Sequence, residues 1–264
     1  MIGFRIPVSG SQESRRGYAL GCSDLLEITG TEPPPKSSAN SATPLYLDLH
    51  ATTPLPKGVK FALFTLPVCA KDVADGDGMT VYVKIVDADD EDQLQGSESI
   101  PLNVKQAVYK RKKERRCRNY TKAYELHGLI IRSGYRIITL DNRREILTKK
   151  YRIRLRGIDA PELGMEYGNE AKEELVKLVE GRCLRLLVYG QDEYRRFVCD
   201  VYCNDTFVQE EMLRKGFAWH YVDYDQRLEF ANWQKEARSK QRGLWKSTKP
   251  KKPWEWRRRN PMQR

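Results

Sequence analysis

The chain has 264 residues and a mass of 30.7 kDa, enough for one or two domains with an apolar core that needs no disulfide framework. Lys and Arg number 47 against 36 for Asp and Glu, and the formal charge of +11 favours a polyanionic partner, either nucleic acid or an anionic membrane surface. No apolar run approaches the roughly 20 residues of a bilayer-spanning helix, which argues against an integral membrane protein. The frequent Tyr, Trp, Val, Ile and Leu argue against a collagen-like or disordered chain.

Six cysteines are spread along the chain, at positions 22, 69, 117, 183, 199 and 203. None forms a Cys-x-x-Cys pair and no His follows at zinc-ligand spacing, so a zinc site is not expected. Cys183 and Cys199 fall in strand-like runs, where we expect them to act as small apolar core residues. Such sparse cysteines are typical of a cytosolic or nuclear protein.

The two ends of the chain have the composition of tails. Residues 31–44 are rich in Pro, Ser and Thr, so we expect residues 1–55 to form a flexible N-terminal tail. The start of the chain lacks the Gly directly after Met that N-myristoylation requires. Residues 248–264 are basic and broken by Pro, and we interpret them as a C-terminal tail that follows a folded domain at 56–247.

Alternating or continuous apolar runs predict strands at 61–68, 80–86, 135–140, 146–158, 183–189 and 197–202. Amphipathic or Gly-terminated segments predict helices at 167–180, 208–215 and 225–242. About five core strands with one helix after the third and further helices at the end suit an α+β, mainly β fold: a small closed OB-type barrel. Residues 87–145 are then a long insertion that leaves the second strand or its hairpin.

The insertion contains two charged stretches. Five carboxylates between positions 87 and 92 lack the ligand spacing of a calcium loop and predict a solvated acidic loop. Apolar residues between 104 and 131 follow a helical period that starts near Pro101 and ends at Gly134. Positions 110–118 hold seven basic residues in nine, which we interpret as a solvated helix face, a phosphate contact or a localisation signal.

Carboxylates and arginines stand at the ends of several predicted strands: Asp77, Arg154, Asp159, Glu162 and Arg196. The carboxylate oxygens of Asp77 and Asp159 suit Ca²⁺ or Mg²⁺, and two arginines are able to clamp the oxygens of a phosphodiester. Glu162 is then free to orient or deprotonate a water molecule. Together these groups would hydrolyse a phosphodiester. The alternative is that they cap strand ends and form ordinary surface ion pairs.

The sequence resembles the thermonuclease family, whose type member is staphylococcal nuclease, because several separated motifs occur in the same order. The resemblance covers roughly 66–245 and rests on Asp75-Gly76-Asp77, Arg154-Leu-Arg-Gly-Ile-Asp159-Ala-Pro-Glu162, Tyr167-Gly168, Glu170-Ala171 and Asp192-x-Tyr194-x-Arg196. The long basic insertion and the tail motif Lys252-Pro-Trp-Glu-Trp256 resemble the plant calcium-dependent staphylococcal-like nucleases more closely.

The resemblance implies an OB-fold barrel and Ca²⁺-dependent hydrolysis of single- and double-stranded DNA and RNA, at the 5′ side of the phosphodiester, leaving 3′-phosphates. It implies the following roles: Asp77, Asp159 and the backbone carbonyl of Ala160 as calcium ligands; Glu162 as general base; Arg154 and Arg196 on the phosphate; Asp75 behind the ligands; Tyr194 and Tyr224 against the nucleotide. For the two tyrosines the alternative is a partly buried place in the barrel wall.

Three features depart from the family pattern. Gly78 replaces the usual Thr after the first ligand and Arg195 replaces the usual Gly before the second arginine, so we expect a looser metal loop and an altered turn. The plant members also resemble peripheral plasma-membrane proteins, but this N-terminus lacks their acylation signature. The alternative function is a catalytically weak or inactive barrel that binds nucleic acid. The basic stretches at 110–118 and 246–264 contain no candidate catalytic residue, so we interpret them as polyanion-capturing surfaces.

Overall fold

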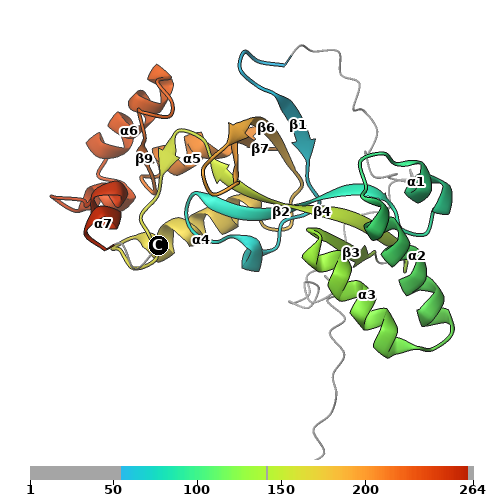
Figure 1. Ribbon diagram of the computed structural model, residues 1–264. Helices are drawn as coiled ribbons and strands as arrows, with labels where there is room; N and C mark the ends of the chain where they lie inside the picture. The colour runs from blue at the N-terminus through green and yellow to red at the C-terminus, as the bar shows by residue number, and fades with distance from the viewer. Residues whose placement is uncertain (1–54, 141, 261–264) are drawn as a thin grey trace, which may run out of the picture.

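The computed structural model describes residues 55–140 and 142–260 (Figure 1). The predicted N-terminal tail lies almost wholly outside these residues and stays a prediction. Five strands form the main path of one sheet, in the order β1 (Phe61–Phe64), β6 (Leu184–Gln191), β7 (Phe197–Cys203), β4 (Glu145–Leu155), β2 (Gly78–Asp87). Neighbours on this path are antiparallel except for the parallel pair of β4 and β7.

The sheet curls until its two ends approach each other, which confirms the predicted OB-type barrel. After β1 the chain crosses towards β2, where the backbone N–H of Leu66 donates to the carbonyl of Tyr82 at 2.8 Å. Two short strands extend the edges, with β3 (Tyr135–Thr139) on β4 and β8 (Thr206–Phe207) on β7. A separate two-stranded ribbon pairs β5 (Ile158–Asp159) with β9 (Trp219–His220).

The three helices predicted around the barrel are present as α4 (Gly168–Val179), α5 (Val208–Arg214) and α6 (Leu228–Ser239). Side chains spaced four apart on α4, namely Ala171, Leu175 and Val179, are buried in the same core as the inward residues of β4, Ile153 and Leu155. Because strand side chains alternate, Arg154 between those two faces away from this core. The hydrophobic core therefore holds the strand ends that carry the candidate site.

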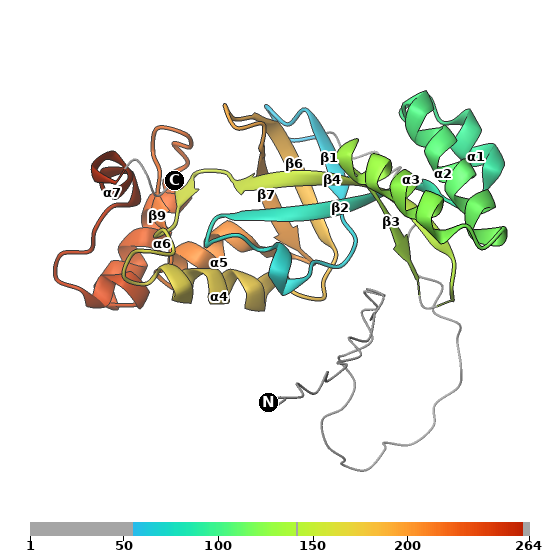
Figure 2. The ribbon, with the colours of Figure 1, turned by 60° about the horizontal axis from the view of Figure 1, so that its bottom comes forward.

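The insertion folds into a second, smaller core beside the barrel, at the end opposite the C-terminal segment (Figures 1 and 2). It contains α1 (Glu91–Gly96), α2 (Leu102–Arg116) and α3 (Tyr120–Arg132). The expectation of one continuous helix was wrong because Arg118 adopts a left-handed backbone with φ of 58°. Asn119 then caps α3 by accepting a hydrogen bond from the backbone N–H of Lys122.

Two further expectations need correction. The acidic stretch is exposed at Asp89, Glu91 and Asp92 as expected, but it is not all loop. Glu91 and Asp92 begin α1, Asp87 ends β2 and pairs with Arg144, and Asp89 pairs with Lys112. Cys199 is buried in the core as expected, but Cys183 is exposed because it precedes β6 and does not belong to its inward face.

The C-terminal segment is ordered where it was expected to be a tail. It follows the 3₁₀ turn Gly243–Lys246, which holds Trp245, and contains the helix α7 (Pro253–Arg259), whose Pro at the first position favours helix initiation. Trp219 packs against both Trp245 and Trp254, which fixes this segment to β9. The remaining short element is a 3₁₀ turn at Ala70–Asp72. No helix among the described residues is long and apolar enough to cross a membrane.

Candidate active site

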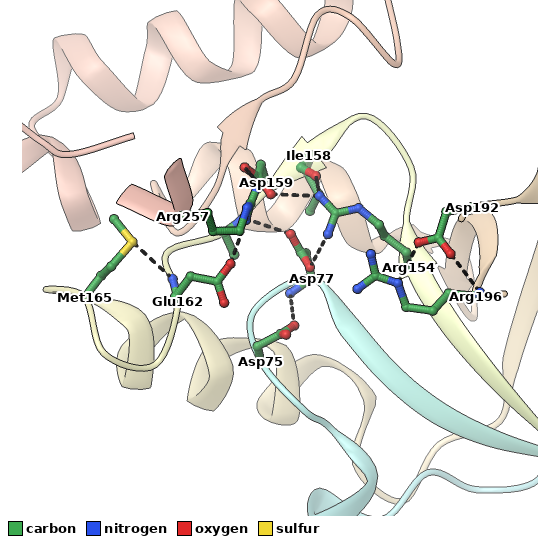
Figure 3. Close-up of polar contacts among 11 residues, drawn as sticks. Asp75, Asp77, Arg154, Ile158, Asp159, Glu162, Met165, Asp192, Arg196 and Arg257 are labelled. Carbon is green, nitrogen blue, oxygen red and sulfur yellow. Dashed lines mark hydrogen bonds and ion pairs between the residues drawn. The ribbon is translucent and has the colours of Figure 1, made fainter. Parts of the chain in front are cut away.

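Two buried carboxylates lie at the centre of the site, brought together from distant parts of the sequence (Figure 3). Asp77 lies in the turn that leads into β2, and Asp159 ends the short strand β5. Their exposed fractions are 4% and 0%. Two backbone N–H groups bind carboxylates of the turn at Asp75–Asp77. The N–H of Ala160 donates to Asp77 Oδ2 at 3.0 Å, and the N–H of Asp77 donates to Asp75 Oδ1 at 3.1 Å. The carboxyl of Asp75 therefore braces the loop that carries Asp77.

Arg154 joins the two buried carboxylates. It is the register partner of Gly78 across the β2–β4 pair, so its side chain begins next to Asp77. Its guanidinium donates to Asp77 Oδ1 at 3.0 Å and to Asp159 Oδ1 at 2.7 Å. The planar fork of arginine is suited to this bridge because its two N–H groups point at separate acceptors.

Burial raises the pKa of both acids. Burial raises the pKa of Asp77 to about 6, with the charge of Arg154 opposing the rise and that of Asp75 adding to it. Burial also raises the pKa of Asp159, followed by the charge of Asp77, while Arg257 and Arg154 act in the opposite direction. A pair of buried carboxylates that repel each other is stabilised by added positive charge.

Glu162 lies beside this pair, in the loop between β5 and α4. It lines an open hollow of about 370 Å³ together with Ala74, Asp75, Leu163, Gly164 and Trp256. Arg257 of α7 donates to Glu162 Oε1 at 2.6 Å and to Asp159 Oδ2 at 2.7 Å. The hollow gives a substrate or a water molecule access to Glu162, and the C-terminal helix forms part of its wall.

Arg196 approaches the site from the start of β7. Its Nε donates to Asp192 Oδ2 at 2.7 Å, and its backbone N–H donates to Asp192 Oδ1 at 2.9 Å. The side chain of Arg196 is 20% exposed, and Figure 3 shows it lying on the Arg154 side of Asp77. Two arginines thus flank the carboxylate pair. Arg154 is bonded to both carboxylates, and Arg196 is held in position by Asp192.

The sequence has relatives that fit this geometry. The family model described as staphylococcal nuclease homologue matches residues 152–247. The chain is 57% identical over 208 residues to staphylococcal-like nuclease CAN1 of Arabidopsis thaliana, covering 79% of this chain and 62% of that protein. It is 41% identical over 274 residues to probable staphylococcal-like nuclease CAN2 of Oryza sativa subsp. japonica, covering 93% and 73%. The chain belongs to the staphylococcal nuclease family.

A bacterial protein also matches this member of the staphylococcal nuclease family. An uncharacterized endonuclease of Escherichia coli O157:H7 is 36% identical over 138 residues, which cover 51% of this chain and 87% of that protein. The first plant relative is longer than this chain, which spans about 62% of its length. The family resemblance predicted from the motifs is therefore confirmed.

The oxygen donors of the site suit a hard divalent cation. Asp77 and Asp159 supply two carboxylates, and the predicted third ligand, the carbonyl of Ala160, follows Asp159 directly in the chain. The described residues contain no cluster of three or more His, Cys, Asp or Glu able to hold a metal, so a cation here depends on these two acids and on main-chain oxygen or water. In this structure the positive charges of Arg154 and Arg257 balance those of the carboxylates: Arg154 pairs with both acids and Arg257 pairs with Asp159.

Glycines in the Asp75–Gly78 turn are explained by close packing. A Cβ at Gly76 would lie 2.6 Å from the Cβ of Ala160 and 2.8 Å from that of Ala171. A Cβ at Gly78 would lie 2.9 Å from Asp75 Oδ1, the oxygen that braces the turn. Gly78 therefore makes room for the Asp75 carboxyl, and the looser loop expected from the replacement of Thr stays a prediction.

Arg195 adopts a left-handed backbone conformation in the turn before Arg196. Its φ is 59°, in the left-handed region that Gly adopts without strain. The turn is closed by the N–H of Arg195 donating to the carbonyl of Asp192, and the N–H of Asp192 donating to the carbonyl of Arg196. A non-Gly residue thus bears this conformation directly before Arg196 and β7, and the expectation that the turn differs from the family's stays a prediction.

The two candidate tyrosines are on the surface and do not contribute to the barrel core. Tyr194 is 49% exposed and its ring lies 5.4 Å from the guanidinium carbon of Arg196. Tyr224 is 63% exposed, and its ring lies 4.9 Å from that of Tyr221. Both rings are therefore accessible to a ligand, on elements that border the two ends of the site.

Arg257 is the site residue that the sequence analysis missed. The basic tail was expected to lie apart from the catalytic residues, but α7 inserts Arg257 between Asp159 and Glu162. Pro253 at a helix start, followed by aromatic and basic residues at helical spacing, was a signal that this tail folds. Nothing in the local sequence indicated which of the neighbouring arginines would reach the site.

Proposed function

We propose that this protein is a Ca²⁺-dependent, sugar-nonspecific nuclease that hydrolyses phosphodiester bonds of DNA and RNA on the 5′ side, leaving 3′-phosphates. The observation that carries the proposal is the bridge from Arg154 to the buried pair Asp77 and Asp159, with Glu162 and Arg196 on either side. The nuclease names of the relatives support the same reaction class.

The residues divide the work of hydrolysis by their positions. A divalent cation bound by Asp77 and Asp159 would act as a Lewis acid on a phosphoryl oxygen. Glu162, which borders the open hollow, orients or deprotonates the attacking water. The bond from phosphorus to O5′ then breaks, so the phosphate stays on the 3′ oxygen. Arg154 and Arg196 stabilise the additional negative charge that develops on the phosphoryl oxygens.

The lack of sugar preference follows from which groups face the substrate. The charged groups of the site address the phosphate, which DNA and RNA share, and they read no base edge. Tyr194 and Tyr224 offer exposed rings on which any base is able to stack. We therefore expect single-stranded DNA, double-stranded DNA and RNA all to be cleaved.

The test is a digestion assay with supercoiled plasmid, single-stranded DNA and RNA. We expect cleavage with Ca²⁺, loss of cleavage with EGTA, and recovery when Ca²⁺ is restored in excess. Terminal labelling of the products should show 3′-phosphates and 5′-hydroxyls. Cleavage that continues at full rate in EGTA and EDTA would overturn the calcium dependence but not the nuclease activity.

The alternative is a barrel that binds nucleic acid without cutting it. The contact of Arg257 with both Asp159 and Glu162 favours it, because those two groups are neutralised in the structure. The same assay separates the two functions: retarded migration of intact nucleic acid at every Ca²⁺ concentration would establish the binding module.

A further inference from the structure

The helix α7 is attached to the barrel next to the active site by aromatic contacts. The ring of Trp254 stacks on Tyr221, with centroids 5.3 Å apart and planes 20° apart, and meets Trp219 edge-on at 5.8 Å. Pro253 is buried at the start of the helix. These contacts hold the base of α7 in place independently of its arginines, so the helix presents a fixed set of side chains to the site.

Of the three consecutive arginines at the end of α7, one reaches the catalytic carboxylates. Arg257 donates to Asp159 Oδ2 and Glu162 Oε1, and its side chain is 22% exposed. Arg258 and Arg259 are exposed and form no ion pair with any residue in the described part of the chain. The contact is therefore specific to one position of the helix.

The hydrogen bond from Arg257 occupies the carboxylate oxygen of Asp159 that a metal ion would use. Arg154 already takes Asp159 Oδ1, so the bond from Arg257 to Oδ2 leaves Asp159 with a guanidinium on each oxygen. A divalent cation bound to the same carboxylate would lie close to the guanidinium of Arg257 and would be repelled by it. Because arginine has a long and flexible stem, the side chain is able to withdraw while Trp254 keeps the helix docked.

We propose that Arg257 is a tethered competitor of the catalytic cation: it occupies Asp159 and Glu162 in the metal-free protein and must release Asp159 for the cation to bind. The C-terminal helix then sets the Ca²⁺ concentration at which the site becomes active. This inference rests on the proposed function in one respect, namely that Asp159 is a cation ligand.

The test measures Ca²⁺ binding to the full chain by isothermal titration calorimetry, without nucleic acid. Arg257→Gln should bind Ca²⁺ about tenfold more tightly or better than the unmodified protein, because a charge-assisted hydrogen bond no longer has to be broken. Arg257→Lys, which keeps the charge but lacks the two-pronged fork, should fall between the two. Arg259→Gln, a charge loss on the same helix away from the site, should leave the dissociation constant unchanged.

A second readout guards against a variant that is merely less stable. Without Ca²⁺, Arg257→Gln should melt at a lower Tm than the unmodified protein because Asp159 loses a counter-ion, and Ca²⁺ should raise its Tm by more. Equal or weaker Ca²⁺ binding by Arg257→Gln, in a protein that melts cooperatively, would overturn the competition and leave the nuclease proposal standing. Absence of Ca²⁺ binding in both proteins would overturn the competition and the calcium dependence together.

Discussion

The guanidinium of Arg154 donates to Asp77 Oδ1 at 3.0 Å, and this bond joins two strands at the point where the site is built. Arg154→Gln removes the positive charge from two buried carboxylates at once. We expect a loss of about 3–5 kcal/mol in the free energy of unfolding, as for breaking a buried ion pair, together with loss of nuclease activity. Urea unfolding at neutral pH measures the first effect.

The matched control for this variant is Arg152→Gln. Arg152 lies two residues earlier on the same strand, is exposed, and forms no ion pair within the described residues. Its substitution should change the free energy of unfolding by less than about 0.5 kcal/mol. Equal losses for both variants would show that the strand tolerates neither change and that the bridge has no special role.

Glu162→Gln tests the assignment of the residue that activates water. The amide keeps the size of the side chain but cannot accept a proton, so turnover should fall by about 10²- to 10⁴-fold. Nucleic-acid binding should remain near normal, because the arginines and the basic surfaces are unchanged. The control is Glu166→Gln, an exposed acid in the same loop. Single-turnover cleavage at saturating enzyme gives the rate, and unaltered turnover in Glu162→Gln would refute the role.

Arg195→Gly tests the cost of the left-handed turn before Arg196. A residue with a Cβ costs about 1–2 kcal/mol in this conformation, and the greater freedom of Gly in the unfolded chain offsets part of the gain. We therefore expect Arg195→Gly to raise the free energy of unfolding by up to about 1 kcal/mol with activity retained. Arg195→Ala, which keeps the strain, should give no such rise. Destabilisation by Gly would mean that the Arg195 side chain contributes more than its backbone costs.

The sequence predicted those parts of the fold that repeat or alternate locally. The alternating apolar residues of β4 and the helical spacing of apolar residues in α4 were sufficient to predict which side chains form the barrel core. The order of the motifs was sufficient to predict that Asp77, Asp159 and Glu162 lie in one site. What it could not provide were contacts decided by the tertiary structure. The break at Arg118 depends on one backbone angle, and the approach of Arg257 depends on where α7 docks.

The basic run on α2 and the following turn is only partly available to a polyanion. Three of its side chains form ion pairs within the molecule: Arg111 and Arg115 with Glu145, and Lys112 with Asp89. The others are exposed and form no ion pair within the described residues, namely Lys110, Lys113, Arg116 and Arg118. The free charges therefore form a surface on the insertion, at the far end from α7 (Figure 2).

Replacing these four free residues by Gln should weaken binding to DNA and flatten its dependence on salt. If each contacts a phosphate, the slope of log affinity against log salt should become shallower by about 3–4. The rate of cleavage of bound DNA should not change. Arg111→Gln is the control, and it should reduce stability through Glu145 while leaving the slope nearly unchanged. An unchanged slope in the four-residue variant, with binding to anionic vesicles lost, would assign this surface to a membrane.

Stability in acid should depend on Asp225, which anchors the loop that carries Tyr221 and Tyr224. Burial alone would raise the pKa of Asp225, but hydrogen bonds from Arg227 and the charge of Arg156 outweigh it and hold the pKa below its usual value. Arg227 in turn donates to Asp200, so the loop is tied to β7. The third neighbour is His220, whose ring faces the main-chain carbonyl of Asp225 at 2.6 Å.

A carboxyl whose pKa is lower in the folded than in the unfolded chain stabilises the fold above the unfolded pKa of about 3.9, and this stabilisation disappears as the pH falls through the folded pKa. Asp225→Asn should therefore cost about 2–3 kcal/mol at pH 7, since Arg227 loses its ionised partner, and the difference from the unmodified protein should shrink below about pH 4. Urea unfolding at pH 7, 5 and 3 measures this. Asp223→Asn, an exposed neighbour, should track the unmodified protein throughout. The side chain of Asp225 also packs closely against Gly157, where an added Cβ would lie 2.6 Å from that of Asp225. A difference between Asp225→Asn and the unmodified protein that persists undiminished at pH 3 would mean that this packing, and not the charge, accounts for the loss.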